Sequence, residues 1–146
     1  MSPEPRLRVV ARVRGIRERD SRLGLVEALG EEREAEARVD ALQQQLTTVT
    51  AFETGDLAEF TTRQRTVTAL ADALTLARAS LDSTRVVAQA ARDRWRTDRS
   101  RLAAVESLLE RREAEHRHEQ RRQEDRRLDA VAEDLWRRRG SGTVTP

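Results

Sequence analysis

An apolar residue stands at every seventh position through the second half of the chain. The series is Phe60, Val67, Leu74, Leu81, Ala88, Trp95, Leu102 and Leu109, and most of the positions three or four residues away hold Leu70, Ala77, Thr84, Ala91 and Val105. Asp98 is one polar interruption of this pattern. Two such positions per heptad form a narrow stripe on an α-helix, so the repeat predicts a coiled-coil helix.

Composition favours the same fold. Only 37% of the 146 residues are hydrophobic, and an equal 37% are charged. This supply of apolar side chains suits a narrow seam better than a broad globular core. The three prolines are Pro3, Pro5 and Pro146, which leaves the whole interval between Pro5 and Pro146 without the strongest helix breaker. We therefore expect an all-α chain.

Signals for one helix to stop and another to start adjoin at a single place. Gly55 suits a left-handed residue that ends a helix, and Asp56 with Glu59 suits a capping box at the start of the next. The expected elements are helix 1 over about 6–52, a turn over about 53–56, helix 2 over about 57–139, and a disordered tail over 140–146. The predicted fold is a long antiparallel two-helix coiled-coil hairpin.

Helix 1 carries a weaker apolar pattern. Its best stretch alternates steps of four and three, at Ala35, Val39, Leu42, Leu46 and Val49. The earlier residues Val9, Val13, Ile16 and Leu23 are interpreted as continuing that seam, and three glycines, at Gly15, Gly24 and Gly30, are expected to soften it.

The expected pairing follows from the position of the turn. Folding back at Gly55 places Pro5 opposite about residue 105, and the basic run 6–22 opposite the basic run 92–101. This juxtaposition is electrostatically unfavourable, so pairing of helices between two chains is the alternative. Helix 2 extends beyond the paired part as a single-helix C-terminal overhang, from about Glu110 to Arg139.

The overhang holds the candidate interaction residues. Charged residues dominate it until a short apolar set appears at Leu128, Val131, Leu135 and Trp136. An exposed Trp beside Leu and Arg side chains is typical of an interface anchor. Trp136 is therefore expected to bind a partner, with folding back onto the hairpin as the alternative, whereas Trp95 is expected in the seam.

Other function classes find little support. The chain has no Cys, Gly-rich phosphate loop, nucleophile motif or enclosed site, so we expect no enzyme and no cofactor. His116 and His118 lie among glutamates in a solvated stretch, which favours a charged surface over a metal site. The net charge is only +2 and the Arg runs alternate with acids, so nucleic-acid binding is not expected. No span or signal peptide is evident, which predicts a cytoplasmic protein.

Three segments resemble the FliJ family, coiled-coil proteins of the bacterial flagellar type III export apparatus. The start, Arg6–Arg14, is similar to the family's N-terminal run of aliphatic and Arg residues. Val105–Arg112 resembles its "v-E-k-L-x-E-R" segment, and Glu124–Ala132 resembles its "E-x-k-x-l-D-E-x-A" segment. Ala130 stands where the family usually has Glu, so one acidic contact is missing.

The resemblance implies a stalk-like hairpin without enzymatic activity. Its implied partners are the export ATPase, the cytoplasmic domain of the export gate and substrate chaperones, with membrane association only through these partners, at the inner face of the membrane. Combined with the unpaired overhang, the resemblance makes six residues candidates for partner contact: Arg122, Glu124, Leu128, Asp129, Leu135 and Trp136. The alternative is a generic coiled-coil scaffold or dimerisation protein with another partner.

Overall fold

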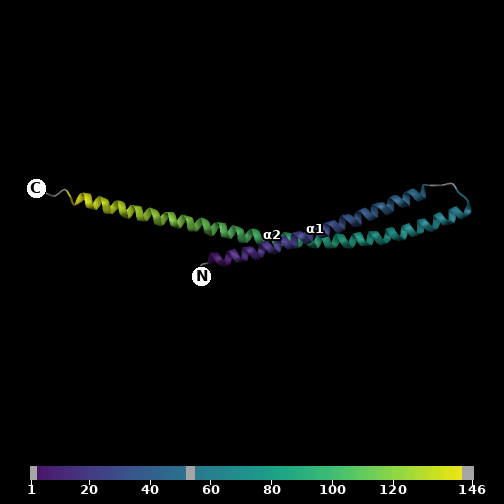
Figure 1. Ribbon diagram of the computed structural model, residues 1–146, viewed down its shortest axis with the longest axis horizontal. Coiled ribbons are helices and arrows are strands. Elements are labelled where there is room, and N and C mark those ends of the chain that lie inside the picture. The colour runs from purple at the N-terminus through teal and green to yellow at the C-terminus, as the bar shows by residue number, and fades with distance from the viewer. Residues whose placement is uncertain (1–2, 52–54, 143–146) are drawn as a thin grey trace. The chain divides into compact units, whose positions relative to one another are not determined.

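The chain forms two long helices. The computed structural model describes residues 3–51 and 55–142, in which α1 spans Pro3–Thr50 and α2 spans Leu57–Gly140, with no strand. Contacts divide the chain into two units, Val13–Arg101 in one, and Met1–Arg12 with Leu102–Pro146 in the other. Each unit therefore contains part of both helices (Figure 1).

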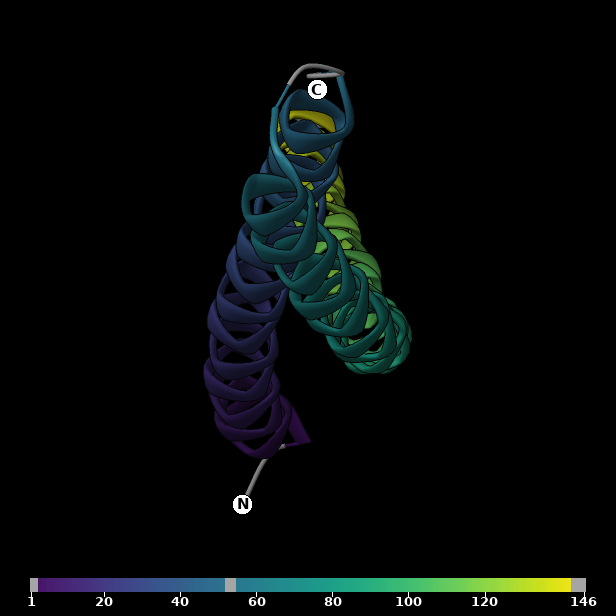
Figure 2. The same cartoon turned by 90° about the vertical axis from the view of Figure 1, so that its right-hand side faces the viewer.

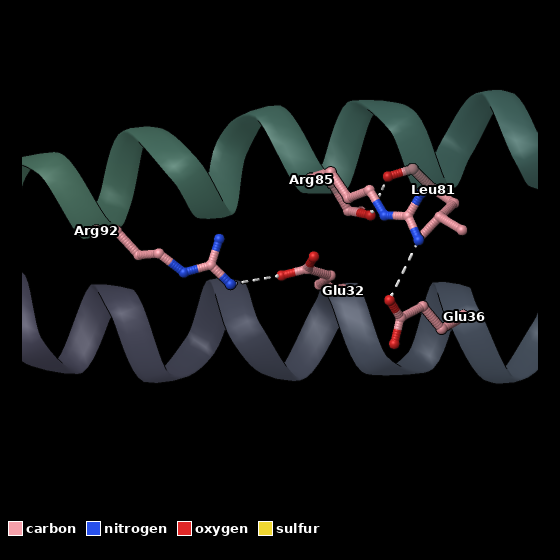
Figure 3. A network of polar contacts seen from close by, with 6 residues as sticks. Glu32, Glu36, Leu81, Arg85 and Arg92 are labelled. Carbon is pink, nitrogen blue, oxygen red and sulfur yellow. Dashed lines mark hydrogen bonds and ion pairs between the residues drawn. The ribbon is translucent and has the colours of Figure 1, made fainter.

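The Val13–Arg101 unit is an antiparallel helical hairpin, which confirms the predicted fold class. A core cluster of Val39, Leu74, Ala77 and Leu81 joins α1 to α2, and Ala35, Leu42 and Leu46 pack against it. Residue numbers rise along α1 as they fall along α2, since Glu32 pairs with Arg92 and Glu36 with Arg85 (Figure 3). The end of α1 and the start of α2 lie near each other (Figure 2).

The start of α2 has the predicted capping box. The backbone N–H of Glu59 donates to Asp56 Oδ1 at 2.9 Å, and the N–H of Asp56 donates to Glu59 Oε2 at 3.2 Å. These two bonds satisfy donors that a helix start leaves free. The left-handed conformation expected at Gly55 stays a prediction, because the φ of Gly55 depends on Thr54, which lies outside the described residues. A Cβ at Gly55 would meet the Glu59 side chain as it folds back to the cap.

The bounds predicted for the turn and for the tail stay predictions. Phe52, Glu53 and Thr54 lie outside the described residues, as do residues 143–146 of the expected tail. Within the described part, α2 runs to Gly140 and a turn follows at Ser141–Gly142.

The seam of α2 follows the heptad repeat, with one exception. In the Val13–Arg101 unit, Leu74, Leu81 and Ala88 are buried, and Val67 and Trp95 are partly buried. Phe60 is exposed, contrary to its expected place in the seam. Val39 packs near Leu74–Leu81, so the last turns of α1 reach only as far as about Val67, and Phe60 lies beyond them.

The expected seam of the first half of α1 is wrong. Val9, Val13, Ile16 and Leu23 are all exposed. The positions that are buried or partly buried include a series two residues before or after Ile16 and Leu23 in the heptad, at Arg14, Glu18, Ser21, Leu25, Ala28 and Glu32. Because α1 is one continuous helix, the strong apolar stretch 35–49 fixes its rotation, and steps of three and four back from Ala35 reach these residues, which apart from Leu25 are polar or small.

The expected pairing is also shifted. Instead of Arg92 facing the basic run of α1, it forms an ion pair with Glu32 at 3.1 Å, while Arg85 reaches Glu36 at 3.4 Å (Figure 3). The shift places acids of α1 opposite arginines of α2. It therefore removes part of the repulsion that made interchain pairing attractive as an alternative.

A polar layer occupies the hairpin near its N-terminal part. Trp95 Nε1–H donates to Glu18 Oε1 at 3.1 Å, and Arg99 lies over the Trp95 ring at 5.2 Å from its centroid. The Ser21 hydroxyl donates to the carbonyl of Glu18 at 3.1 Å, and Asp98 is buried. Arg14 Nη1 is also buried, and no described acceptor reaches it.

Arg14→Leu is expected to raise the free energy of unfolding by about 1–2 kcal/mol, because it removes an unsatisfied buried donor and supplies an apolar seam residue. Urea unfolding followed by circular dichroism measures the change. Arg33→Leu, at an exposed position of α1, is the matched control and should change stability by less than about 0.5 kcal/mol. A lower free energy of unfolding in Arg14→Leu would mean that the Arg14 guanidinium does have a hydrogen-bond partner in solution.

The second unit joins the first turns of α1 to the C-terminal part of α2. Arg8 forms an ion pair with Glu113 at 3.7 Å, and Leu7, Leu102, Val105 and Leu109 are partly buried. Pro5 was expected to lie opposite about residue 105. Because Arg8 pairs with Glu113, the start of α1 lies opposite residues farther toward the C-terminus of α2. No described helix is long and apolar enough to cross a membrane.

Candidate partner-binding surface

The C-terminal part of α2 is a helix without a covering element in its own unit. Every described residue from Ala114 to Gly142 is exposed, although α2 continues to Gly140. This segment, called the exposed segment below, includes the six predicted contact residues. Whether they contact a partner stays a prediction.

The structure places the six residues on two adjacent faces. Glu124, Leu128 and Leu135 are separated by four and seven residues, so they share one face of α2. Arg122, Asp129 and Trp136 are separated by seven residues each and share a neighbouring face, about 100° around the helix. The six are therefore brought together as one broad strip rather than as an enclosed site.

Val131 belongs to this strip and was left out of the predicted contact residues. It lies between Leu128 and Leu135 at helical spacing, and all three side chains are more than half exposed. Trp136 is the most exposed of the group, at 76%. The return of apolar residues at spacings of three and four was the signal that could have included Val131.

Leu128, Val131 and Leu135 do not continue the pairing face of α2, whereas Trp136 stands in line with the partly buried Leu108 in steps of seven. In this unit the partly buried residues Leu102 and Leu109 lead, in steps of seven, to His116, Gln123 and Ala130. Leu128 and Leu135 stand two positions away from that series, and hence on another side of the helix. A partner bound to Leu128, Val131 and Leu135 would thus approach from a different side than the first turns of α1 do.

Charged side chains around the strip are tied mainly to their own helix. Arg122 lies 3.8 Å from Glu119, and Arg137 lies 3.2 Å from Glu133 and 4.0 Å from Asp134. Such exposed pairs contribute little to stability and can be exchanged for contacts with a partner at small cost. His116 accepts or donates a hydrogen bond with Gln120 at 3.0 Å, and the described residues contain no cluster of three potential metal ligands.

Comparison with known protein families indicates the kind of protein to which this helix belongs. The model of the family described as Flagellar FliJ protein matches residues 3–141. This chain belongs to the FliJ family. The match covers both helices, so the resemblance predicted from three segments is confirmed over almost the whole chain. No curated protein and no solved structure matches it.

Membership places the chain among components of flagellar protein export. The FliJ family is one of structural and escort proteins rather than of known enzymes. In this FliJ-family chain, the hairpin has an apolar cluster between its two helices, and the exposed segment carries apolar side chains in solvent.

Proposed function

We propose that this FliJ-family protein is a helical stalk of the flagellar type III export apparatus that binds the export ATPase and the cytoplasmic domain of the export gate, and escorts substrate chaperones. It works by binding and not by catalysis. Its attachment at the inner face of the membrane is through the gate protein. The surface we assign to these contacts is the exposed segment, centred on Leu128, Leu135 and Trp136.

The observation that carries the proposal is the exposure of Leu128, Val131, Leu135 and Trp136 on one stretch of a helix that has no covering element in its unit. Single exposed apolar residues are common, but an aligned group marks an interaction site. An amphipathic helix of this kind can lay its apolar strip into a groove of a partner protein. Large aromatic side chains such as Trp136 supply much of the binding energy in interfaces of this type.

The alternative of a scaffold that dimerises through the heptads is less well supported. Leu74 and Leu81 are buried against α1 of the same chain, in the cluster with Val39. A second chain could use these residues only if the hairpin opened. By contrast, the exposed segment is available without any rearrangement of its unit.

The experiment is an affinity capture from the native cells with a tagged full-length chain. The triple variant Leu128→Asn, Leu135→Asn, Trp136→Ala is expected to recover at least about tenfold less export ATPase and gate protein, with unchanged helicity by circular dichroism. The matched control is Leu76→Asn, Val86→Asn, Val87→Asn, which removes three exposed apolar residues of α2 elsewhere. Undiminished recovery by the triple variant would contradict the assigned surface, and failure of the unchanged protein to recover either partner would contradict the function.

A further inference from the structure

The two ends of the hairpin unit are held together by different kinds of contact. The end near the turn, called the apolar tip below, has a buried cluster of Val39, Leu74, Ala77 and Leu81. Farther from the turn, residues 13–34 of α1 lie along residues 84–101 of α2, and the buried apolar side chains of these two segments are Ala28 and Ala88. Leu25, Leu29 and Trp95 are only partly buried there. Because burial of apolar area is the main stabilising term, this end is joined less strongly than the apolar tip.

Two charged groups between these segments have no partner. Asp98 is 9% exposed, and no described residue forms a hydrogen bond or an ion pair with its carboxylate. Arg14 Nη1 is buried without an acceptor among the described residues. A charged group that is taken out of water without a partner opposes burial. Parting of the two segments would return both groups to water and relieve this cost.

The helices also pack incompletely beside Asp98. A hollow at this level is lined by Asp98 together with Arg17, Asp20, Arg94, Thr97 and Arg101. None of its three arginines forms an ion pair with Asp98 in the part of the chain that the structure describes. The side chains of α1 and α2 therefore do not close over each other here, and the hollow adds no apolar contact to hold the segments together.

The contacts that do join the segments are largely polar. Trp95 Nε1–H donates to Glu18 Oε1 at 3.1 Å, and Arg92 pairs with Glu32 at 3.1 Å (Figure 3). When the segments part, each of these groups exchanges its protein partner for water, so the net contribution of each contact is much smaller than its gross strength. Such contacts fix the register of the two helices more than they prevent their separation.

This part of α1 is also weak as a helix on its own. It contains Gly15, Gly24 and Gly30, each of which disfavours a helix relative to Ala. A separated helix of this length is only marginally stable in water, so detachment from α2 is coupled to melting of the segment. In the other unit, the first turns of α1 form an exposed ion pair from Arg8 to Glu113, a kind of contact that contributes little.

We infer that residues 13–34 of α1 are a releasable strap, which detaches from α2 while the apolar tip stays closed. Its release uncovers Ala88, Ala91 and Trp95, the seam face of α2 that the strap covers. The hairpin unit thus has a closed form and a partly open form, and the second presents a face of α2 that the first hides. The inference goes beyond the proposed function and does not depend on the partners proposed for the exposed segment.

The test is hydrogen exchange of the full-length chain, followed by mass spectrometry at several urea concentrations below the unfolding transition. Relative to their intrinsic rates, the amides of the strap should exchange at least about tenfold faster than those of residues 36–49. Their exchange should also depend less on urea, because a partial opening exposes less surface. Equal protection and equal urea dependence of the two segments would overturn the inference, since the hairpin would then open only as a whole.

A substitution in the apolar tip separates the two kinds of opening. Leu81→Ala should accelerate exchange of residues 36–49 by at least about tenfold and that of the strap by less than about twofold, because release of the strap leaves residue 81 covered. The control Leu76→Ala, at an exposed position of α2, should alter neither segment. Equal acceleration of both segments by Leu81→Ala would overturn the inference.

A substitution under the strap gives an arm that does not rely on a destabilised chain. Asp98→Leu replaces the unpartnered carboxylate with an apolar side chain and should slow exchange of the strap by at least about fivefold. The matched control Asp82→Leu removes an exposed carboxylate from the same helix and should change exchange by less than about twofold. Unchanged or faster exchange of the strap in Asp98→Leu would overturn the inference, because Asp98 would then not weaken the closed form.

Discussion

Replacing Leu81 with Ala is expected to lower the free energy of unfolding by about 2–4 kcal/mol. Leu81 is 7% exposed and lies in the cluster that joins the two helices, with Val39, Leu74 and Ala77. Truncation removes apolar contacts and leaves a space that two straight helices fill poorly. A hairpin of two helices has no second layer of core to compensate for the loss.

Urea unfolding followed by circular dichroism measures this change. The matched control is Leu76→Ala, which makes the same truncation in the same helix at a side chain that is 72% exposed. It should change the free energy of unfolding by less than about 0.5 kcal/mol. Equal effects of the two substitutions would mean that Leu81 is not covered by α1 in solution, and would favour pairing between chains.

Replacing three glycines of α1 together, Gly15→Ala, Gly24→Ala and Gly30→Ala, is expected to raise the free energy of unfolding by about 2–3 kcal/mol. A Cβ built at any of the three meets no atom within 4 Å, and none of them has a positive φ. Each change therefore brings the helix preference of Ala without a clash. The gain comes largely from restricting the unfolded chain.

The same denaturation series tests this prediction. Gly140→Ala is the control, because Gly140 is the last residue of α2 and the ends of helices fray, so its effect should be within about 0.5 kcal/mol. A triple variant less stable than the unchanged protein would show that something approaches these glycines in solution.

The candidate site could be predicted in its position but not in its details. The run of charged residues after Leu109 and the return of Leu128, Leu135 and Trp136 are visible in the sequence, and the structure leaves all of that stretch exposed. Val131 was missed as a contact candidate, although it lies on the same face. Which protein covers the strip depends on the partner's surface, and that information is not contained in this chain.

The helices, the capping box at Asp56–Glu59 and most of the seam of α2 could be predicted from the sequence alone, because spacing along one helix and bonds within one turn are local properties. The face of α1 that pairs with α2, and the shift between the two helices, depend on tertiary packing and became clear from the structure. A continuous helix can present a single rotation to its neighbour. The apolar stretch from Ala35 to Val49 sets that rotation for the whole of α1, and it carries Arg14 and Glu18 inward while Ile16 remains in solvent.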